Sequence, residues 1–226
     1  ELLKAYSLIN ELKDEHWKHL KLEQIKQVIA ACSGLYLEAV SEEAYATGDQ
    51  DISLKLEAIN RSDQKMTLKS VQLLPQEKSI ALNKDLGNNV ALKEQVDLSI
   101  SSGSKLTSPY WLKEKGSLGM YKVEDPALVG NPITTAQHKV VFTIDFAGAS
   151  INFERDVIYK YNDPVKGEVY QPFEIVPKAV ANIASKVVIF SEDQAKEIPV
   201  TITGYRDSIS GIVNLKVPEG WKVTPK

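Results

Sequence analysis

Two histidines three residues apart, near the start of the chain, are the best candidates for metal ligands. His16 and His19 follow Glu15 in a segment whose apolar residues recur at helical spacing, and side chains at positions i and i+3 share one face of a helix. A zinc site needs a third and usually a fourth ligand. The remaining histidine, His138, stands beside a predicted β-strand. The pattern therefore favours a solvated helix face over a metal site, and we expect no metal or other cofactor.

Nucleophilic catalysis also lacks a complete motif in this sequence. Cys32 is the single cysteine, and on a predicted helix we expect it to be a small buried apolar residue rather than a nucleophile. The sequence contains no Gly-x-Ser-x-Gly elbow. The stretch GSLG at 116–119 lacks the Lys-Ser/Thr pair that follows the glycines of a phosphate-binding loop. We therefore expect this chain not to be an enzyme.

Tyr110 and Trp111 are the candidate interaction residues, because they stand in a long irregular section at 101–137. A loop of that length in a compact domain usually packs on itself or serves a binding function. Exposed, the two rings would form a surface for a glycan or a protein partner. Folded back, Trp111 would plug the end of a sandwich core. The size of the indole favours this structural role, and we then expect Trp111→Ala to cost about 3–5 kcal/mol.

Composition excludes several classes of function. The net charge is −3, and the absence of a basic cluster argues against nucleic-acid binding. No apolar run reaches the roughly 20 residues of a membrane-spanning helix. The hydrophobic fraction of 43% is enough for a real core. Because the chain begins at Glu1, without an initiating Met or a targeting signal, we expect it to be a piece of a longer protein.

The elements that must position these residues are a helical segment followed by strands. Residues 1–33 have helical spacing, with 13–15 either a break or a continuation and Gly34 as the expected stop. Residues 52–58 and 139–147 alternate apolar and polar side chains, which predicts half-buried strands. A change of phase near Ser70 predicts a bulge. Residues 147–150 predict a hairpin with Gly148 at the first central position of a type II′ turn.

These patterns predict a mainly β protein with two immunoglobulin-like β-sandwich domains, preceded by the N-terminal helical segment. We expect the helical segment at 1–33 and the first sandwich at 34–161, with its long loop at 101–137. Turn residues predict a linker at 162–177, and the second domain covers 178–226, with strands at 186–190, 196–203 and 211–217. A complete sandwich typically needs about seven strands in ~100 residues. The second domain is therefore expected to be small or truncated.

Five stretches carry a resemblance to a known family. They are LYLEA at 35–39, LEAINRS at 56–62, SPYWL at 108–112, YKYNDPVKGE at 159–168 and LKVPEGW at 215–221. The first four resemble the C-terminal region of large bacterial deacetylases of the PIG-L (LmbE-like) family. The last resembles the NEW3 type of immunoglobulin-like module, which often lies beside carbohydrate-active catalytic domains. The resemblance covers nearly the whole chain, and its most specific parts are PYWL and DPVKGE.

In that family an N-terminal domain binds zinc through an Ala-His-Pro-Asp-Asp motif and a later histidine, and neither feature is found here. The resemblance therefore implies a non-catalytic accessory region that supports or positions a deacetylase domain acting on N-acetylglucosamine derivatives. Its partner would be that catalytic domain of the same polypeptide, and its location the periplasm or the cell surface. The alternative is a carbohydrate-binding module that uses the loop aromatics Tyr110 and Trp111, with a glycan as its ligand.

Overall fold

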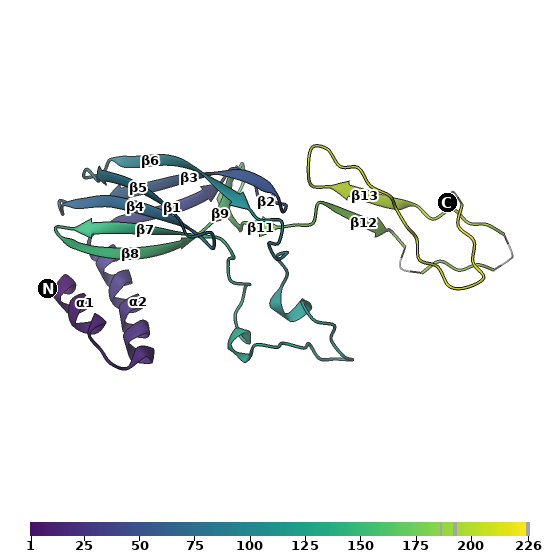
Figure 1. Ribbon diagram of the computed structural model, residues 1–226, viewed down its shortest axis with the longest axis horizontal. Helices are drawn as coiled ribbons and strands as arrows, with labels where there is room; N and C mark the ends of the chain where they lie inside the picture. Colours follow the sequence, from purple (N-terminus) through teal and green to yellow (C-terminus); the bar gives the residue numbers. More distant parts are fainter. Residues whose placement is uncertain (186, 192–193, 225–226) are drawn as a thin grey trace. The chain divides into compact units, whose positions relative to one another are not determined.

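The chain is mainly β, with several sheets and two α-helices in the residues that the structure describes, and it divides into two units (Figure 1). The computed structural model describes residues 1–185, 187–191 and 194–224. Unit 1 comprises Glu1–Val176 and unit 2 comprises Pro177–Lys226. The prediction of a mainly β protein with an N-terminal helical segment is confirmed.

The N-terminal segment is a hairpin of two helices, α1 (Leu2–Asn10) and α2 (Glu15–Cys32). The break between them is stabilised by Asp14, whose side chain accepts a hydrogen bond from the backbone N–H of Trp17 at 3.1 Å. Such a cap satisfies one of the free donors at a helix start. At the other end Gly34 has a φ of 60°, the left-handed conformation that commonly follows a helix. Within the described residues, no helix combines the length and the apolar character that a membrane span requires.

Two large sheets follow in unit 1. One has five strands in the order β10-β9-β1-β3-β6, and the other has four in the order β5-β4-β7-β8. Neighbouring strands are antiparallel, except that β1 and β9 run parallel. The bounds are β1 Leu35–Ser41, β3 Gln50–Asn60, β4 Met66–Leu74, β5 Lys78–Asp85, β6 Ala91–Ile100, β7 Lys139–Phe146, β8 Ala149–Asp156, β9 Ile158–Asp163 and β10 Gly167–Pro172.

Both sheets contribute to one hydrophobic core, and they form two layers in Figure 1. In each sheet a central strand buries every second side chain, as the alternation predicts. On β3 the buried apolar residues are Ile52, Leu54, Leu56 and Ala58, and on β7 they include Val140, Phe142, Ile144 and Phe146. A core enclosed by two sheets is what a β-sandwich requires.

Two local features of the four-stranded sheet, a bulge and a tight turn, are predicted from the sequence. The register of β4 shifts between Leu68 and Ser70 against both of its neighbours, so the predicted bulge is confirmed. The hairpin from β7 to β8 pairs Phe146 with Ala149, so its central residues are Ala147 and Gly148. Both have positive φ, 53° and 104°, which is the signature of a type I′ turn. The predicted type II′ turn, one residue later, is therefore wrong.

Of the segment 162–177, which its turn residues predict to be a linker, residues 162–176 belong to unit 1. Asp163 Oδ1 accepts the backbone N–H groups of Val165 at 2.8 Å and Lys166 at 2.7 Å. This turn closes the hairpin between β9 and β10 rather than separating domains. The short strand β11 (Glu174–Ile175) then pairs in parallel with β2 (Tyr45–Ala46). The division between the two units follows Val176.

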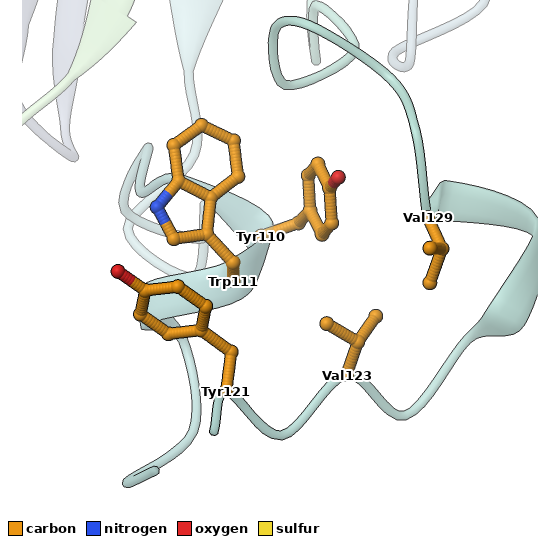
Figure 2. Close-up of a pocket in the computed structure, with 5 residues that line it drawn as sticks. All are labelled: Tyr110, Trp111, Tyr121, Val123 and Val129. Carbon is orange, nitrogen blue, oxygen red and sulfur yellow. The ribbon is translucent and has the colours of Figure 1, made fainter. Parts of the chain in front are cut away.

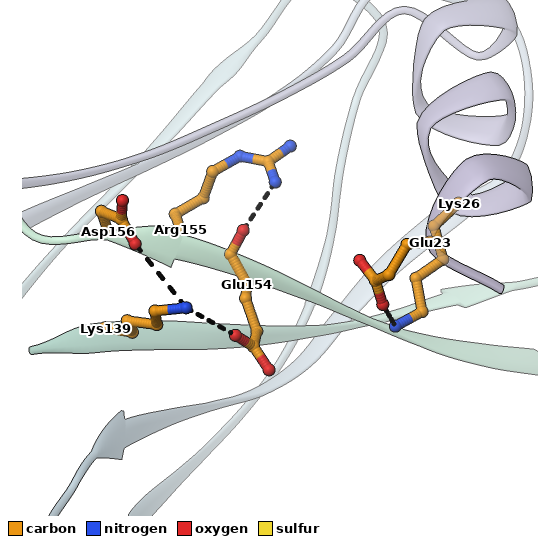
Figure 3. Close-up of polar contacts among 6 residues, drawn as sticks. All are labelled: Glu23, Lys26, Lys139, Glu154, Arg155 and Asp156. Atoms are coloured by element: carbon orange, nitrogen blue, oxygen red, sulfur yellow. Dashed lines mark hydrogen bonds and ion pairs between the residues drawn. The ribbon is translucent and has the colours of Figure 1, made fainter. Parts of the chain in front are cut away.

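Charged side chains lie along β7 and β8 (Figure 3). Lys139 Nζ forms ion pairs with Glu154 at 3.3 Å and Asp156 at 3.9 Å. Arg155 points differently: its Nε donates to the carbonyl oxygen of Leu37 on β1 at 3.2 Å. Because this hydrogen bond joins β8 to β1, it links the two sheets. Burial lowers the pKa of the Arg155 guanidinium.

The described part of unit 2 contains one antiparallel pair, β12 (Ala179–Ile183) and β13 (Val200–Gly204). None of its described residues is buried. Of the predicted strand at 196–203, only the part from Val200 is in β13, and the predicted strand at 211–217 is irregular. The prediction at 186–190 starts at Lys186, which lies outside the described residues, and 187–190 form no strand. Alternation in unit 2 therefore overestimates its strands, because a strand also needs a neighbour for its hydrogen bonds.

Candidate functional site

The long loop at 101–137 is held at its base by β11. The backbone N–H of Thr107 donates to the carbonyl oxygen of Ile175 at 2.8 Å. Thr107 Oγ1 accepts the N–H of Ile175 at 2.9 Å and Nε2 of Gln137 at 3.4 Å. Ile175 is only 1% exposed. Thr107 is therefore tied to the buried Ile175 and Gln137 is tied to Thr107, although none of residues 101–137 is itself buried.

Between these ends lie two short 3₁₀ helices, η1 (Tyr110–Leu112) and η2 (Pro126–Leu128). Pro109 precedes η1 with a φ of −53°, and proline cannot change that angle by much. The rings of Tyr110 and Trp111 meet edge to face, with centroids 4.9 Å apart and planes at 89°. Two adjacent aromatic residues thus form a right-angled corner on the loop.

This corner is part of a pocket of about 550 Å³, which Tyr121, Val123 and Val129 complete (Figure 2). All five lining residues belong to the loop, and none of them is charged. The sequence identifies Tyr110 and Trp111 but misses the other three. The sequence signal for these three residues is weak, because aromatic and β-branched residues in an irregular loop show no periodicity that would place them together.

The prediction that Trp111 plugs the end of the sandwich is wrong. Trp111 is half-buried and is absent from the core of unit 1. The physical reason is that η1 lies beyond the Thr107 anchor, so the indole packs against other loop residues instead of entering between the sheets. Tyr110 and Trp111, the predicted interaction residues, therefore line the loop pocket.

The remaining residues with possible chemistry do not come together. His16 lies edge-on against Trp17, with centroids 5.4 Å apart, while His19 is exposed on α2. No group of three or more His, Cys, Asp or Glu side chains in the described residues could hold a metal ion. Cys32 is exposed, which corrects the prediction of a buried residue. Ser33 is buried in its place, and its hydroxyl donates to the carbonyl oxygen of Ile29 at 2.6 Å.

His138 is the one histidine in the interior, at 4% exposed. Its ring meets Phe173 edge to face at 5.9 Å, and Nε2 has no hydrogen-bond partner among the described residues. Burial lowers the pKa of the imidazole, because an apolar environment disfavours the charged form. His138 is therefore a buried residue near the loop base whose lowered pKa favours the neutral imidazole.

A network of charges occupies the outer face of the five-stranded sheet. Lys160 Nζ lies 2.7 Å from Glu38 and 3.1 Å from Glu168, and the Tyr170 hydroxyl donates to Glu168 at 2.6 Å. Burial alone would lower the pKa of the Lys160 ammonium, but the two carboxylates outweigh it and raise this pKa. Burial and a hydrogen bond to Glu38 raise the pKa of the Tyr36 phenol to about 12. The network therefore joins β10, β9 and β1 through ion pairs and hydrogen bonds.

Comparison with known proteins gives little further information. No family model matches the chain, and no curated protein matches it. One solved structure with some similarity is the alkylpurine DNA glycosylase AlkC of Pseudomonas fluorescens, bound to DNA containing an abasic site analog, at 11% sequence identity. The similarity covers 75% of this chain and 41% of that one, with a TM-score of 0.28. A similarity this low carries no argument about fold or function.

Proposed function

We propose that the chain is a non-catalytic accessory region of a larger, exported, PIG-L-type zinc-dependent deacetylase acting on N-acetylglucosamine derivatives. Its role is to support or position the catalytic domain of the same polypeptide. The observation that best supports this proposal is an exposed apolar stripe on α2, in addition to the side that packs on unit 1.

Helix α2 has two apolar sides. The inner side includes Ile25, packed against the core, and Ile29, which is 3% exposed. On the other side Trp17, Leu20 and Val28 remain 52%, 38% and 44% exposed. Their spacing of three and eleven residues places them on one face of a helix with 3.6 residues per turn. A surface helix needs only one apolar stripe to pack on its own domain, so the second stripe supports a further contact.

Polar neighbours keep the Trp17 ring oriented at this stripe. The ring lies edge-on to His16, and Lys21 Nζ is 5.9 Å from its centroid. Trp is among the residues that contribute most energy to protein interfaces. The stripe of Trp17, Leu20 and Val28 is therefore the proposed contact with the catalytic domain.

The finer fold proposal is that unit 1 is immunoglobulin-like. Its five-stranded and four-stranded sheets enclose one core, and the variable type of immunoglobulin domain also has nine strands in two sheets. Unit 2 is then proposed to be a second, partial immunoglobulin-like module, as the pair β12 and β13 among its described residues is far short of a sandwich.

The test uses the full-length polypeptide. Its reading frame is inspected for a deacetylase domain, and amide hydrogen exchange is then measured across α2. We expect a zinc deacetylase domain in the frame and slower amide exchange across α2 in the full-length protein than in this chain alone. The double change Trp17→Ser with Leu20→Ser should abolish that difference and lower deacetylase turnover, without lowering the melting temperature of this chain.

The matched control is Val90→Ser, an exposed apolar residue of unit 1 at 62% exposed, which should leave exchange and turnover unchanged. A reading frame without a deacetylase domain, or equal exchange of α2 in both proteins, would overturn the proposal.

A further inference from the structure

The loop pocket has the composition of a ligand site whose middle is apolar and whose rim is polar. Ring carbons of Tyr110, Trp111 and Tyr121 and the methyl groups of Val123 and Val129 surround its middle (Figure 2). The phenol oxygens and the indole nitrogen lie at ring ends turned away from that middle. In the part of the chain that the structure describes, these three polar atoms have no hydrogen-bond partner within the protein. They are therefore available to a ligand.

The lining also excludes several classes of ligand. No charged side chain contributes to it, so neither a phosphate nor a carboxylate would find a countercharge, and a divalent cation would find no oxygen ligands of the usual kind. The chemistry that remains is a neutral molecule with an apolar face and hydroxyl groups around its edge.

We propose that this pocket binds the pyranose ring of a glycan. A pyranose has C–H groups on its faces, which stack on aromatic rings, and hydroxyl groups at its edge. The indole N–H and the two phenols turn away from the middle of the pocket, so they bond a glycan only where it extends beyond the stacked ring. The right-angled corner of Tyr110 and Trp111 offers a flat ring surface and a wall beside it. This inference does not rest on the proposed accessory role: it concerns the loop, whereas that role concerns α2.

The anchoring of the loop gives the site its rigidity. Thr107 is hydrogen-bonded to Ile175 of β11, and Gln137, at the other end of the loop, donates to Thr107 Oγ1. Thr134 Oγ1 donates to the carbonyl oxygen of Ser108 next to η1 at 3.1 Å. A site whose supporting residues are held in place loses less conformational entropy on binding. The pocket therefore rests on a fixed base although its rings are exposed to solvent.

The binding test follows the indole N–H signals of the three tryptophans by NMR of the intact chain. The probes are the methyl β-glycosides of N-acetylglucosamine, glucose and galactose, added to high millimolar concentration, with tetramethylammonium chloride as a separate arm. We expect a saturable shift of the Trp111 signal with at least one glycoside, while the Trp17 and Trp221 signals stay constant. The Trp111 signal is assigned by its loss in Trp111→Phe.

Two variants locate the site. Tyr121→Ala should weaken glycoside binding by about tenfold, equal to roughly 1.4 kcal/mol, and its ring is 67% exposed, so the fold should be unchanged. Trp17→Ala removes a comparably exposed indole from α2 and should leave binding unaltered.

Four outcomes would overturn the proposal. They are no shift with any glycoside, a response to tetramethylammonium alone, equal shifts of all three indole signals, and full binding by Tyr121→Ala. The second outcome would indicate an aromatic cage for a quaternary ammonium group instead.

Discussion

Units 1 and 2 share a sequence pattern but differ in what that pattern buries. Phe142 on β7 of unit 1 is 0% exposed, whereas Ile202 on β13 of unit 2 is 47% exposed. Both residues stand in runs that alternate apolar and polar side chains. The strand β7 faces a second sheet across a common core, and the described residues of unit 2 supply no second sheet to β12 and β13. Alternation therefore predicts which side of a strand is apolar, while burial depends on a second layer that alternation does not encode.

The largest expected effect comes from deleting a ring in the core of unit 1. Phe142→Ala should lower the free energy of unfolding by about 3–5 kcal/mol, because it removes apolar contacts and leaves a cavity between the sheets. Urea denaturation followed by circular dichroism measures this change. A loss below about 1 kcal/mol would mean that the two sheets are not packed as tightly as 0% exposure implies.

A buried polar residue should have the next largest effect. Asn60 is 1% exposed, and its Nδ2 donates to the carbonyl oxygens of Gln64 at 2.8 Å and Leu86 at 3.1 Å. Asn60→Ala would leave these acceptors and the N–H of Ser62 without their partner, at a cost of about 1–3 kcal/mol. The same denaturation experiment measures this cost. The control is Asn88→Ala, at an exposed asparagine whose Nδ2 donates to Asp63. Equal stability of the two variants would show that the buried hydrogen bonds are replaced by water.

The pH dependence of unit 1 should be smaller and should come from His138. Its pKa in the folded state is lowered by burial, so the unfolded chain, with the ordinary value of about 6.5, binds the proton more readily. The contribution of the neutral His138 to the free energy of unfolding is therefore fully present above pH 6.5 and decreases as the pH drops below that value. Urea midpoints between pH 8 and pH 5 measure this fall, which His138→Phe should reduce and His16→Gln should not. A midpoint that rises on acidification would contradict the assignment.

The smallest effect is expected in unit 2. Ile202→Ser changes an exposed side chain on a two-stranded sheet, so the free energy of unfolding should stay within about 0.5 kcal/mol of the parent. Thermal melts of the intact chain test this against Phe142→Ala. A destabilisation above about 1 kcal/mol would show that Ile202 is buried in solution, and the contrast between the two units would then fail.

The sequence predicts the central strands well, because burial on one side imposes a strict period. The change of phase at Ser70 even locates a bulge. The sequence predicts the boundary of unit 1 poorly, because the turn residues at 162–167 look the same whether they join two domains or close a hairpin. The sequence does not predict strand β5, because its residues are mostly polar and exposed at the edge of a sheet.

The candidate site could be predicted only in part. Tyr110 and Trp111 are adjacent in sequence and attract notice, but Tyr121 enters the pocket through the path of an irregular loop. Whether Trp111 turns inward or remains on the loop depends on the hydrogen bonds between Thr107 and Ile175. These hydrogen bonds join residues 68 positions apart in the sequence, and no local sequence pattern predicts such a contact.

The position of β11 also decides how unit 1 responds to mechanical tension. Pro177 begins unit 2 directly after Val176, so a pull transmitted along the backbone from unit 2 first loads β11. That strand is held by two paired residues of β2 and by Thr107. Under load these few hydrogen bonds would rupture before the long ladders of the two large sheets. Stretching the chain would therefore release the base of the 101–137 loop and withdraw the buried Ile175 from the core first, while the ladders of the two large sheets stay paired.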